Sequence, residues 1–455
     1  MSRIAQIAAA LAGYDPKALS VEGVQAFLAQ LAAPAAVSER EDVALLDALG
    51  RVLAQDIVSP FNVPPHDNSA MDGFAFDGAA LDGASGSELQ LRVVGTALAG
   101  AAWRGSVGAG EALKIMTGAV LPAGLDTVVP QEFCSVDGER VRFPASTLAR
   151  GDNRRLAGED LMAGRAALKQ GDRITPAALG LLASLGLPRV PVRRRLRVAF
   201  FSTGDEILSL GDAPREGAVY DSNRYTVFGL LTRLGCEVLD LGLVRDDPAA
   251  LEATLRRAAA QADAIITSGG VSVGEADHTR AVMQRLGDMA FWRIAMRPGR
   301  PMAVGLISGD FTGFQAKSAS SAHGAGASSY QNHSENAVLF GLPGNPVAVM
   351  VTMLAFVRPA LLQMMGCNAA NAAAPPLLRA TSVAAIRKKP GRTEYQRGFV
   401  SAVPGALPEV RIAGNQGSGV LSSMVEANGL VVLHHEQGNV AAGDEVDVMM
   451  FEGVV

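Results

Sequence analysis

The sequence predicts a multidomain protein of mixed α/β and β class. We expect a central α/β domain with a parallel sheet, a discontinuous helical segment and two smaller β-rich domains. The chain has 455 residues, which corresponds to two to four domains at roughly 100–200 residues per domain. Strand-like apolar runs alternate with helical patterns from about residue 195 to 365, whereas short β-like runs between Gly and Pro turns fill residues 56–155 and the C-terminal tail.

The central α/β domain is predicted by this regular alternation. Buried strands are predicted at LRVAFFS (196–202), CEVLDLG (236–242), DAIITSGG (263–270) and AVLFGLPGNP (337–346). Helices are predicted at 224–235, 248–262 and 277–287, and from Pro346 onward. Strands joined through helices by short connections form a parallel sheet with helices on both faces, and ligands bind at the carboxyl ends of its strands.

The remaining segments supply the other domains. Residues 20–35 and 39–55 place apolar residues at helical spacing, and a further helix is expected from Pro176 to near Gly186. We assign 1–55 plus 156–190 to a discontinuous helical domain, 56–155 to a β-rich domain, 191–370 to the α/β domain and 371–455 to a C-terminal β domain. Residues 308–336 are rich in Ser, Ala and Gly, which favours a flexible insertion over a binding element.

Composition excludes several classes of function. The net charge is −5 and aromatic residues make up 5% of the chain, so neither a nucleic-acid coat nor an anionic membrane surface is expected as a partner. The apolar run at 347–357 is about half the roughly 20 residues of a membrane span, and the N-terminus resembles an amphipathic helix, not a signal peptide. Three scattered cysteines and six histidines without ligand spacing disfavour a zinc site. We therefore expect a cytoplasmic protein.

Several loops carry residues suited to phosphate chemistry. PPHDNSAMDGFAF (64–76) presents Asp72 at a sharp bend, FSTGDE (201–206) places Glu206 after a buried strand, and RDD (245–247) ends another strand. Each has a plain structural alternative, such as a self-capping turn or a helix cap. TSGGVSVGEADHT (267–279) is more specific, because its glycines let backbone N–H groups approach phosphate oxygens and its carboxylates suit Mg²⁺.

Two further loops would complete such a site. RIAMRPGRP (293–301) gathers arginines around a Pro-Gly turn, and GLPGNPVAV (341–349) leads from a strand into a helix. The alternatives are solvated arginines and an ordinary strand-to-helix turn. Together these loops predict Mg²⁺-dependent chemistry on a phosphorylated ligand at one edge of the sheet.

The order of the motifs resembles one family. DNSAMDGFA, MTGA, STGDE, YDSNR, RDDP, SGGVSVGEAD, FWRIAMRPGRP, GLPGNPV and GRTEYQRG occur in the series that is typical of the molybdopterin molybdenumtransferases, which include the bacterial MoeA proteins and the E domain of gephyrin. The resemblance implies a molybdopterin-binding α/β domain. It also implies Mg²⁺-dependent insertion of molybdate into adenylylated molybdopterin with release of AMP.

The resemblance implies an elongated homodimer, in which the α/β domain of one subunit faces the β-rich domain of the other. Its partners would be a molybdopterin adenylyltransferase and recipient molybdoenzymes. By the same resemblance, the catalytic residues would be Asp72, Glu206, Asp246 and Asp277, of which the last three would bind the metal. The substrate-binding residues would be Thr117, Arg155, Asp160, Ser268, Gly269, Gly270, Ser272, Gly274, Arg293, Arg297, Arg300, Pro343, Gly344, Asn345, Arg397 and Ser418.

Three departures from the family pattern concern the oxyanion. Arg293, Arg297 and Arg300 stand where lysine is usual, and Ala348 follows GNPV where serine is frequent. The insertion at 308–336 enters close to the same site. Three alternatives stay open: a paralogue that inserts tungstate, a protein resembling the molybdopterin adenylyltransferase or a pterin carrier, and a non-enzymatic scaffold.

Overall fold

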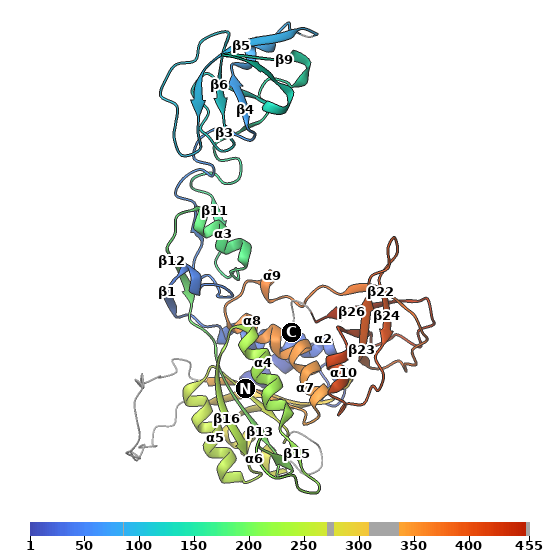
Figure 1. The fold of residues 1–455 in the computed structure, drawn as a ribbon. Helices are drawn as coiled ribbons and strands as arrows, with labels where there is room; N and C mark the ends of the chain where they lie inside the picture. The colour runs from blue at the N-terminus through green and yellow to red at the C-terminus, as the bar shows by residue number, and fades with distance from the viewer. Residues whose placement is uncertain (85, 271–276, 309–335, 452–455) are drawn as a thin grey trace.

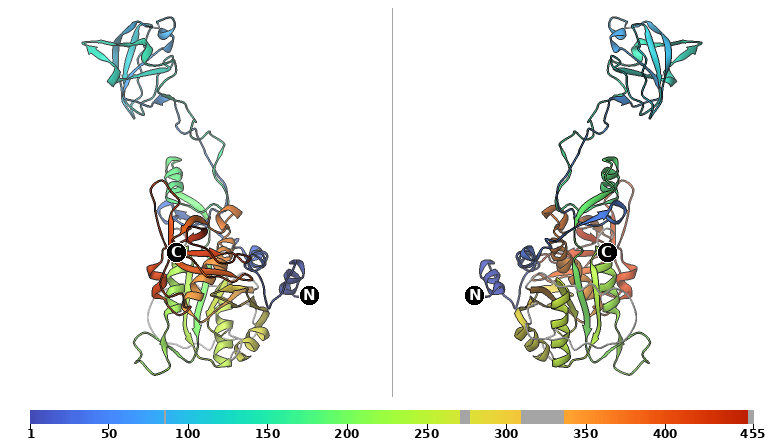
Figure 2. Two further views of the ribbon diagram at one scale, coloured as in Figure 1. Left: turned by 90° about the vertical axis from the view of Figure 1, so that its right-hand side faces the viewer. Right: turned by 90° about the vertical axis from the view of Figure 1, so that its left-hand side faces the viewer.

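The computed structural model describes residues 1–84, 86–270, 277–308 and 336–451. The molecule is elongated: a β-rich domain stands at one end of a narrow neck, and the α/β and C-terminal domains lie together at the other (Figure 1, Figure 2). The predicted multidomain architecture of mixed α/β and β class is confirmed.

A six-stranded sheet forms the centre of the α/β domain, in the order β16-β13-β17-β21-β20-β18. Its strands are β13 (Arg197–Thr203), β16 (Glu237–Val244), β17 (Ala264–Ser268), β18 (Gly287–Arg293), β20 (Pro301–Ser308) and β21 (Asn336–Leu342). The first four strands of that order are parallel, as predicted, whereas β20 and β18 extend the sheet by antiparallel pairing. Most of the predicted insertion, residues 309–335 between β20 and β21, lies outside the described residues.

Helices cover both faces of this sheet because successive side chains of a strand point to opposite sides. The predicted helices are present as α4 (Ser222–Leu234), α5 (Pro248–Gln261), α6 (Asp277–Leu286), α7 (Pro346–Thr352) and α8 (Arg358–Met364). On β13, Val198 and Phe200 join the core that contains α4, α7 and α8. Ala199 and Phe201 join the core formed with α5 and α6.

The stretch from α7 through a π-helical segment (Met353–Val357) to α8 is continuous helix. Within the described part of the chain, Pro346–Met364 is the single helix long and apolar enough to cross a membrane. Its apolar window is 83% buried inside the protein, so it serves as a core helix.

The N-terminal helices pack on the α/β domain. α1 (Arg3–Ala10) and α2 (Val21–Ala32) supply buried residues to the same core as β13 and α8. Ser20 caps α2 by accepting a hydrogen bond from the backbone N–H of Gly23. Phe27 is fully buried, with its ring edge-on to Trp292 at a centroid distance of 4.8 Å. Gln25 Nε2 donates to the carbonyl of Ala355 at 3.2 Å.

The helix predicted at 39–55 is wrong. This segment instead forms β1 (Arg40–Ala44), a short 3₁₀ helix (Leu45–Asp47) and irregular chain. β1 pairs antiparallel with β12 (Arg189–Arg193), and Val52 and Leu53 make further bridges to residues of the returning chain. Pairing with a segment about 150 residues later in the sequence overrides the local helical spacing, because helix propensity is weak compared with tertiary burial.

The neck contains the two chain segments that lead to the β-rich domain and back. Its elements are the β1–β12 pair, β2 (Ile57–Val58) paired with β11 (Ala166–Leu168), and the predicted helix α3 (Pro176–Ser184). Leu53, Leu182 and Val192 pack in a small core of its own. The outgoing and the returning segment of the neck therefore run antiparallel to each other.

Both β-rich domains are confirmed. The distal one has a six-stranded sheet in the order β7-β4-β6-β5-β9-β8. Its strands are β4 (Gly73–Phe76), β5 (Glu88–Ala97), β6 (Glu111–Ile115), β7 (Thr127–Pro130), β8 (Ser135–Asp137) and β9 (Arg140–Pro144), with β3 (Asn68–Ser69) and β10 (Arg154–Arg155) paired at its base.

The C-terminal domain is a barrel that the β23–β25 pairing closes. Its strands are β22 (Leu378–Ser382), β23 (Thr393–Ser401), β24 (Glu409–Ile412), β25 (Gly429–Leu433) and β26 (Glu445–Met450). A two-residue strand, β19 (Met296–Arg297), adds to β23 in parallel. The loop that follows β18 is thereby attached to the barrel.

Replacing Phe27 by Ala tests the assignment of α2 to the α/β core. We expect the free energy of unfolding of this domain to fall by about 3–5 kcal/mol, because the change leaves a cavity beside Trp292. Chemical denaturation in a Trp103→Phe background, where Trp292 fluorescence reports the transition, measures the loss. Val425→Ala, at a side chain 84% exposed, is the control and should change stability by less than about 0.5 kcal/mol. An unchanged Phe27→Ala transition would remove α2 from this core.

Candidate functional site

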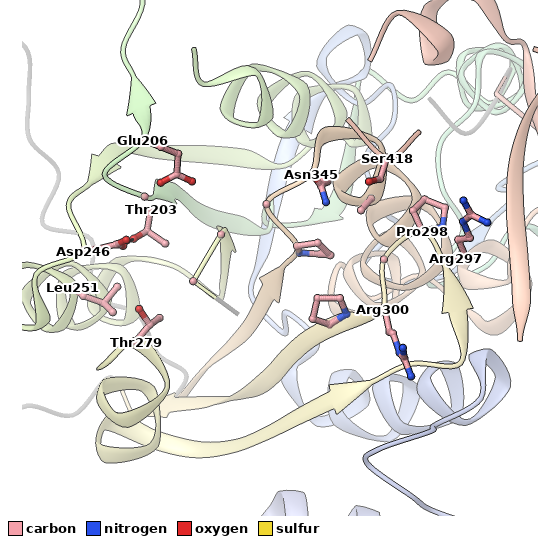
Figure 3. A pocket seen from close by; sticks show the side chains of 18 of the residues that line it. Thr203, Glu206, Asp246, Leu251, Thr279, Arg297, Pro298, Arg300, Asn345 and Ser418 are labelled. Carbon is pink, nitrogen blue, oxygen red and sulfur yellow. Dashed lines mark hydrogen bonds between the residues drawn. The ribbon is translucent and has the colours of Figure 1, made fainter. Parts of the chain in front are cut away.

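A cavity of about 480 Å³ lies at the carboxyl ends of the parallel strands (Figure 3). Loops after β13, β16, β17 and β21 line it, together with the loop between β19 and β20 and one loop of the C-terminal barrel. The side chains and glycines at this cavity are Thr203, Gly204, Glu206, Asp246, Asp247, Pro248, Leu251, Gly269, Gly270, Thr279, Arg297, Pro298, Gly299, Arg300, Pro301, Pro343, Gly344, Asn345, Ala348, Gln416 and Ser418.

Two backbone segments lie next to each other in this cavity: the 269–270 turn and the 343–345 loop. Gly269 and Gly270 have φ of +87° and +69°, which glycine adopts without strain. A Cβ added at Gly269 would lie 2.4 Å from the carbonyl oxygen of Thr203, so the turn packs directly against the end of β13. The backbone N–H of Gly269 donates to Leu342 O at 3.2 Å, which joins the turn to the end of β21.

Carboxylates gather on one side of the cavity. Glu206 and Asp246 lie there, with Asp247 following in the chain (Figure 3). The Thr203 hydroxyl donates to Asp246 Oδ1 at 2.6 Å, which orients this carboxylate from the end of β13. Among the described residues no three His, Cys, Asp or Glu side chains form a ready metal cluster. Asp277 is the first residue of α6, and its side chain is not described.

Guanidinium groups lie on the other side. Arg297 and Arg300 line the cavity from the Pro-Gly turn between β19 and β20 (Figure 3). Arg293, the third arginine of the motif, ends β18 and does not line the cavity. Its backbone instead holds the N-terminal segment: its N–H donates to Pro16 O, and its carbonyl accepts from Leu19 N–H.

The C-terminal barrel contributes Gln416 and Ser418 to the cavity. The carbonyl of Ser418 accepts from the backbone N–H of Val347 at 3.1 Å, which ties the barrel loop to the first turn of α7. Arg397 lies behind this loop and is 1% exposed. Its guanidinium donates to Ser423 Oγ and to the carbonyls of Asn415 and Gly417. Burial, and then the nearby charge of Arg297, hold the pKa of Arg397 below its ordinary value.

Four of the predicted site residues lie on the distal domain and neck. Asp72 accepts from both the backbone N–H and the hydroxyl of Thr117, each at 2.7 Å. The backbone hydrogen bond, followed by the hydroxyl, holds the pKa of Asp72 below its ordinary value. Arg155 forms an exposed ion pair with Glu159 at 2.6 Å, and Asp160 is exposed nearby. Within one chain, the distal domain and the adjoining part of the neck stand well away from the α/β domain that contains the cavity (Figure 1).

The structure thus brings most, but not all, of the predicted site residues together. Glu206, Asp246, Gly269, Gly270, Arg297, Arg300, Pro343, Gly344, Asn345 and Ser418 line one cavity. Ser268 is buried behind it. Ser272 and Gly274 lie outside the described residues. Sequence reasoning missed Thr279 and Gln416; Gln416 lies in the glycine-containing stretch GNQGSG, which was the available signal.

This cavity has the composition of a site for a phosphorylated ligand, and comparisons with known proteins identify the family. Residues 19–186 match the MoeA N-terminal region (domain I and II), 199–363 a probable molybdopterin binding domain, and 379–451 the MoeA C-terminal region (domain IV). The molybdopterin molybdenumtransferase of Haemophilus influenzae is 39% identical over 91% of this chain and 94% of its own length. That of a Nostoc species is 33% identical over 90% and 88%.

Solved structures agree with this result. A molybdopterin biosynthesis MoeA protein from Pyrococcus horikoshii superimposes with a TM-score of 0.67 at 28% identity, covering 96% of this chain and 99% of that one. A second MoeA structure from that organism, at 24% identity and a TM-score of 0.72, covers 95% and 100% and supports the fold. The chain belongs to the molybdopterin molybdenumtransferase family, whose members are transferases of molybdenum cofactor biosynthesis.

The close approach at Gly269 gives a testable expectation. Gly269→Ala should lower the free energy of unfolding by about 1–2 kcal/mol from its positive φ and by a further 1–3 kcal/mol, approximately, from the contact with Thr203 O. Gly124→Ala is the matched control, because Gly124 has φ +88° and an added Cβ would meet nothing within 4 Å. Denaturant titration of both variants isolates the contact. Equal losses would contradict the close packing of the turn on β13.

Proposed function

We propose that this protein inserts molybdate into adenylylated molybdopterin, in a Mg²⁺-dependent reaction that releases AMP. The observation that carries the proposal is the division of one cavity into two charged sides. Glu206 and Asp246 lie on one side of the cavity and Arg297 and Arg300 on the other (Figure 3), with the 269–270 turn and the 343–345 loop also lining it. Such a site can hold a metal-neutralised pyrophosphate on one side and an oxyanion on the other.

The backbone segments suit the phosphate of the pterin. Gly270 and Gly344 line the cavity without side chains, so a phosphate oxygen can approach main-chain N–H groups closely. The 343–345 loop also leads directly into α7, and the N-terminus of a helix favours an anion. In this arrangement the two segments bind and orient the substrate.

The acidic side fits Mg²⁺ when substrate phosphates complete the coordination. Mg²⁺ is usually bound through one or two carboxylates together with substrate phosphates and water. Glu206 and Asp246 supply two hard oxygen donors, and Asp277 at the start of α6 is the expected third ligand. When bound, the metal would neutralise negative charge on the phosphoryl oxygens as the pyrophosphate linkage is cleaved.

The basic side suits molybdate. Arg297 and Arg300 carry fixed charge and can each donate two parallel hydrogen bonds to an oxyanion. Ser418 adds a hydroxyl from the barrel, whereas Ala348, 2% exposed, adds none. Arg397 acts through the loop it holds: its hydrogen bonds to the carbonyls of Asn415 and Gly417 support the backbone on which Ser418 lies.

The distal residues reach a cavity only if two copies of the chain associate. We therefore propose a homodimer, in which Asp72, Thr117, Arg155 and Asp160 of one subunit approach the cavity of the other. The neck exposes large apolar side chains that such contact would cover, among them Leu46 (90% exposed), Val58 (52%) and Met162 (57%). In the cytoplasm, the substrate would come from a molybdopterin adenylyltransferase and the product would pass to recipient molybdoenzymes.

Release of AMP tests the proposed reaction. Purified protein mixed with adenylylated molybdopterin, Mg²⁺ and low-micromolar molybdate should release AMP and reconstitute a cofactor-free molybdoenzyme, and chelation of Mg²⁺ should stop both. Asp246→Asn should reduce AMP release about 100-fold or more, whereas Asp137→Asn, at an exposed position of β8, should not change it. AMP release that requires tungstate in place of molybdate would indicate the paralogue, and release independent of any oxyanion would contradict the proposal.

Mixing two inactive variants tests whether each active site is formed by the cavity of one subunit and the distal domain of the other. Asp72→Asn and Glu206→Gln are each expected to be inactive as homodimers. After co-refolding or co-expression in equal amounts, half of the dimers are mixed, and each mixed dimer holds one complete site. Activity should therefore return to roughly a quarter of the wild-type value. Failure to recover activity while mixed dimers are demonstrably present would refute the placement of the distal domain.

A further inference from the structure

A buried polar cluster lies directly behind the cavity. Ser202 and Thr267 are the next-to-last residues of the neighbouring strands β13 and β17, Ser268 precedes the 269–270 turn, and Asp221 and Asn223 are at the start of α4. All five side chains are less than 9% exposed. Ser202 Oγ donates to Asp221 Oδ1 at 3.0 Å and lies 3.3 Å from Ser268 Oγ.

Within this cluster, Asn223 contacts the 343–345 loop and the side chain of Ser268, the residue before the 269–270 turn. Its Nδ2 donates to the carbonyl oxygen of Gly344 at 2.7 Å and to Ser268 Oγ at 3.4 Å. The orientation of the amide follows from the first contact, because the opposite orientation would place Oδ1 against a carbonyl oxygen. One amide group thereby joins the 343–345 loop to Ser268, the last residue of β17 before the 269–270 turn.

Capping of α4 does not explain this residue. Asp221 is the N-cap, and its Oδ1 accepts from the backbone N–H of Arg224 at 3.0 Å. The cluster also carries a cost: Asp221 Oδ2, Asn223 Oδ1 and Thr267 Oγ1 are buried and have no partner among the described residues. Each such group destabilises a fold relative to an apolar side chain of the same shape. Asn223 therefore does not serve mainly to stabilise the fold. Its role is better explained by the position in which its hydrogen bonds hold the 343–345 loop.

We propose that Asn223 is a positioning residue that sets the spacing of the 343–345 loop and the 269–270 turn, and so prepares their backbone N–H groups for the pterin phosphate. The inference rests on the proposed function of this cavity. The two segments are in close proximity, since a Cβ added at Gly344 would lie 3.9 Å from Gly269 Cα. A small movement of the loop would therefore change the distance between the backbone N–H groups of the two segments.

Two variants separate the hydrogen bond from the volume of the side chain. Asn223→Leu keeps a similar shape and removes the donor, and Asn223→Asp replaces the donor by a carboxylate oxygen facing Gly344 O. Equilibrium dialysis with molybdopterin itself, under anaerobic conditions, should show about tenfold weaker binding for Asn223→Leu and a greater loss for Asn223→Asp at pH 8. Circular dichroism at each pH checks that Asn223→Asp is folded; if it does not fold at pH 8, the binding measured for Asn223→Leu decides the test.

The pH dependence of molybdopterin binding distinguishes a lost hydrogen bond from a general loss of stability. A carboxyl at position 223 is neutral when protonated and can then donate to Gly344 O, and burial raises its pKa. The ratio of the Asn223→Asp dissociation constant to that of wild type should therefore approach 1 as pH falls from 8 to 5.5. The same ratio for Asn223→Leu should not change. Asp221, the titratable neighbour in the cluster, is common to all three proteins.

Asn428→Leu is the matched control. Asn428 Nδ2 also donates to a backbone carbonyl, that of Val400 at 2.8 Å, but inside the C-terminal barrel. This variant should lose stability while its affinity for molybdopterin stays at the wild-type value. Wild-type protein that does not bind molybdopterin would overturn the proposed function. Wild-type binding together with unchanged binding by both Asn223 variants would overturn the positioning role alone.

Discussion

The parallel pairing of β16, β13, β17 and β21 is the constraint on which the rest of the molecule depends. Residues of these strands that lie side by side, such as Val198, Ala264 and Val338, are far apart in the sequence. Because parallel strands run in one direction, the loops that follow them emerge at one edge. Carboxylates, glycine turns and a helix N-terminus meet there, and no single segment of the chain contains the site.

The second constraint is the attachment of the basic side to a different domain. Arg297 lies on β19, which pairs with β23 of the barrel, while Ser418 O accepts from Val347 N–H at the start of α7. The barrel is therefore fastened to the α/β domain at two edges of the cavity. These two attachments fix the positions of Arg297 and Ser418 relative to the start of α7.

Much of the fold could be predicted from the sequence, because helices and strands of the α/β domain carry regular apolar periods and clear caps. Gly235, with φ +96°, ends α4 where the pattern placed it. The strand Arg40–Ala44 could not be predicted locally, since its partner lies about 150 residues later. Likewise Arg293, Arg297 and Arg300 look equivalent in the sequence, yet Arg293 is the last residue of β18 and does not line the cavity, whereas Arg297 and Arg300 follow in the segment that leads to β20 and do line it. The neck sets the distance between Asp72 and the cavity. Neither motifs nor hydrophobic periodicity predict how far the neck extends.

The packing of α2 has a consequence for the synthesis of the chain. The partners of this helix come very late: Gln25 donates to Ala355, 330 residues further on. At about 5–20 residues per second, the apolar face of α2 emerges from the ribosome roughly 15–70 seconds before α8 exists. Meanwhile the neck and the distal domain, whose own partners are nearer in sequence, can already fold. The apolar face of α2 therefore stays without its late partners during this time, and we expect the nascent chain to be a substrate of holding chaperones during translation.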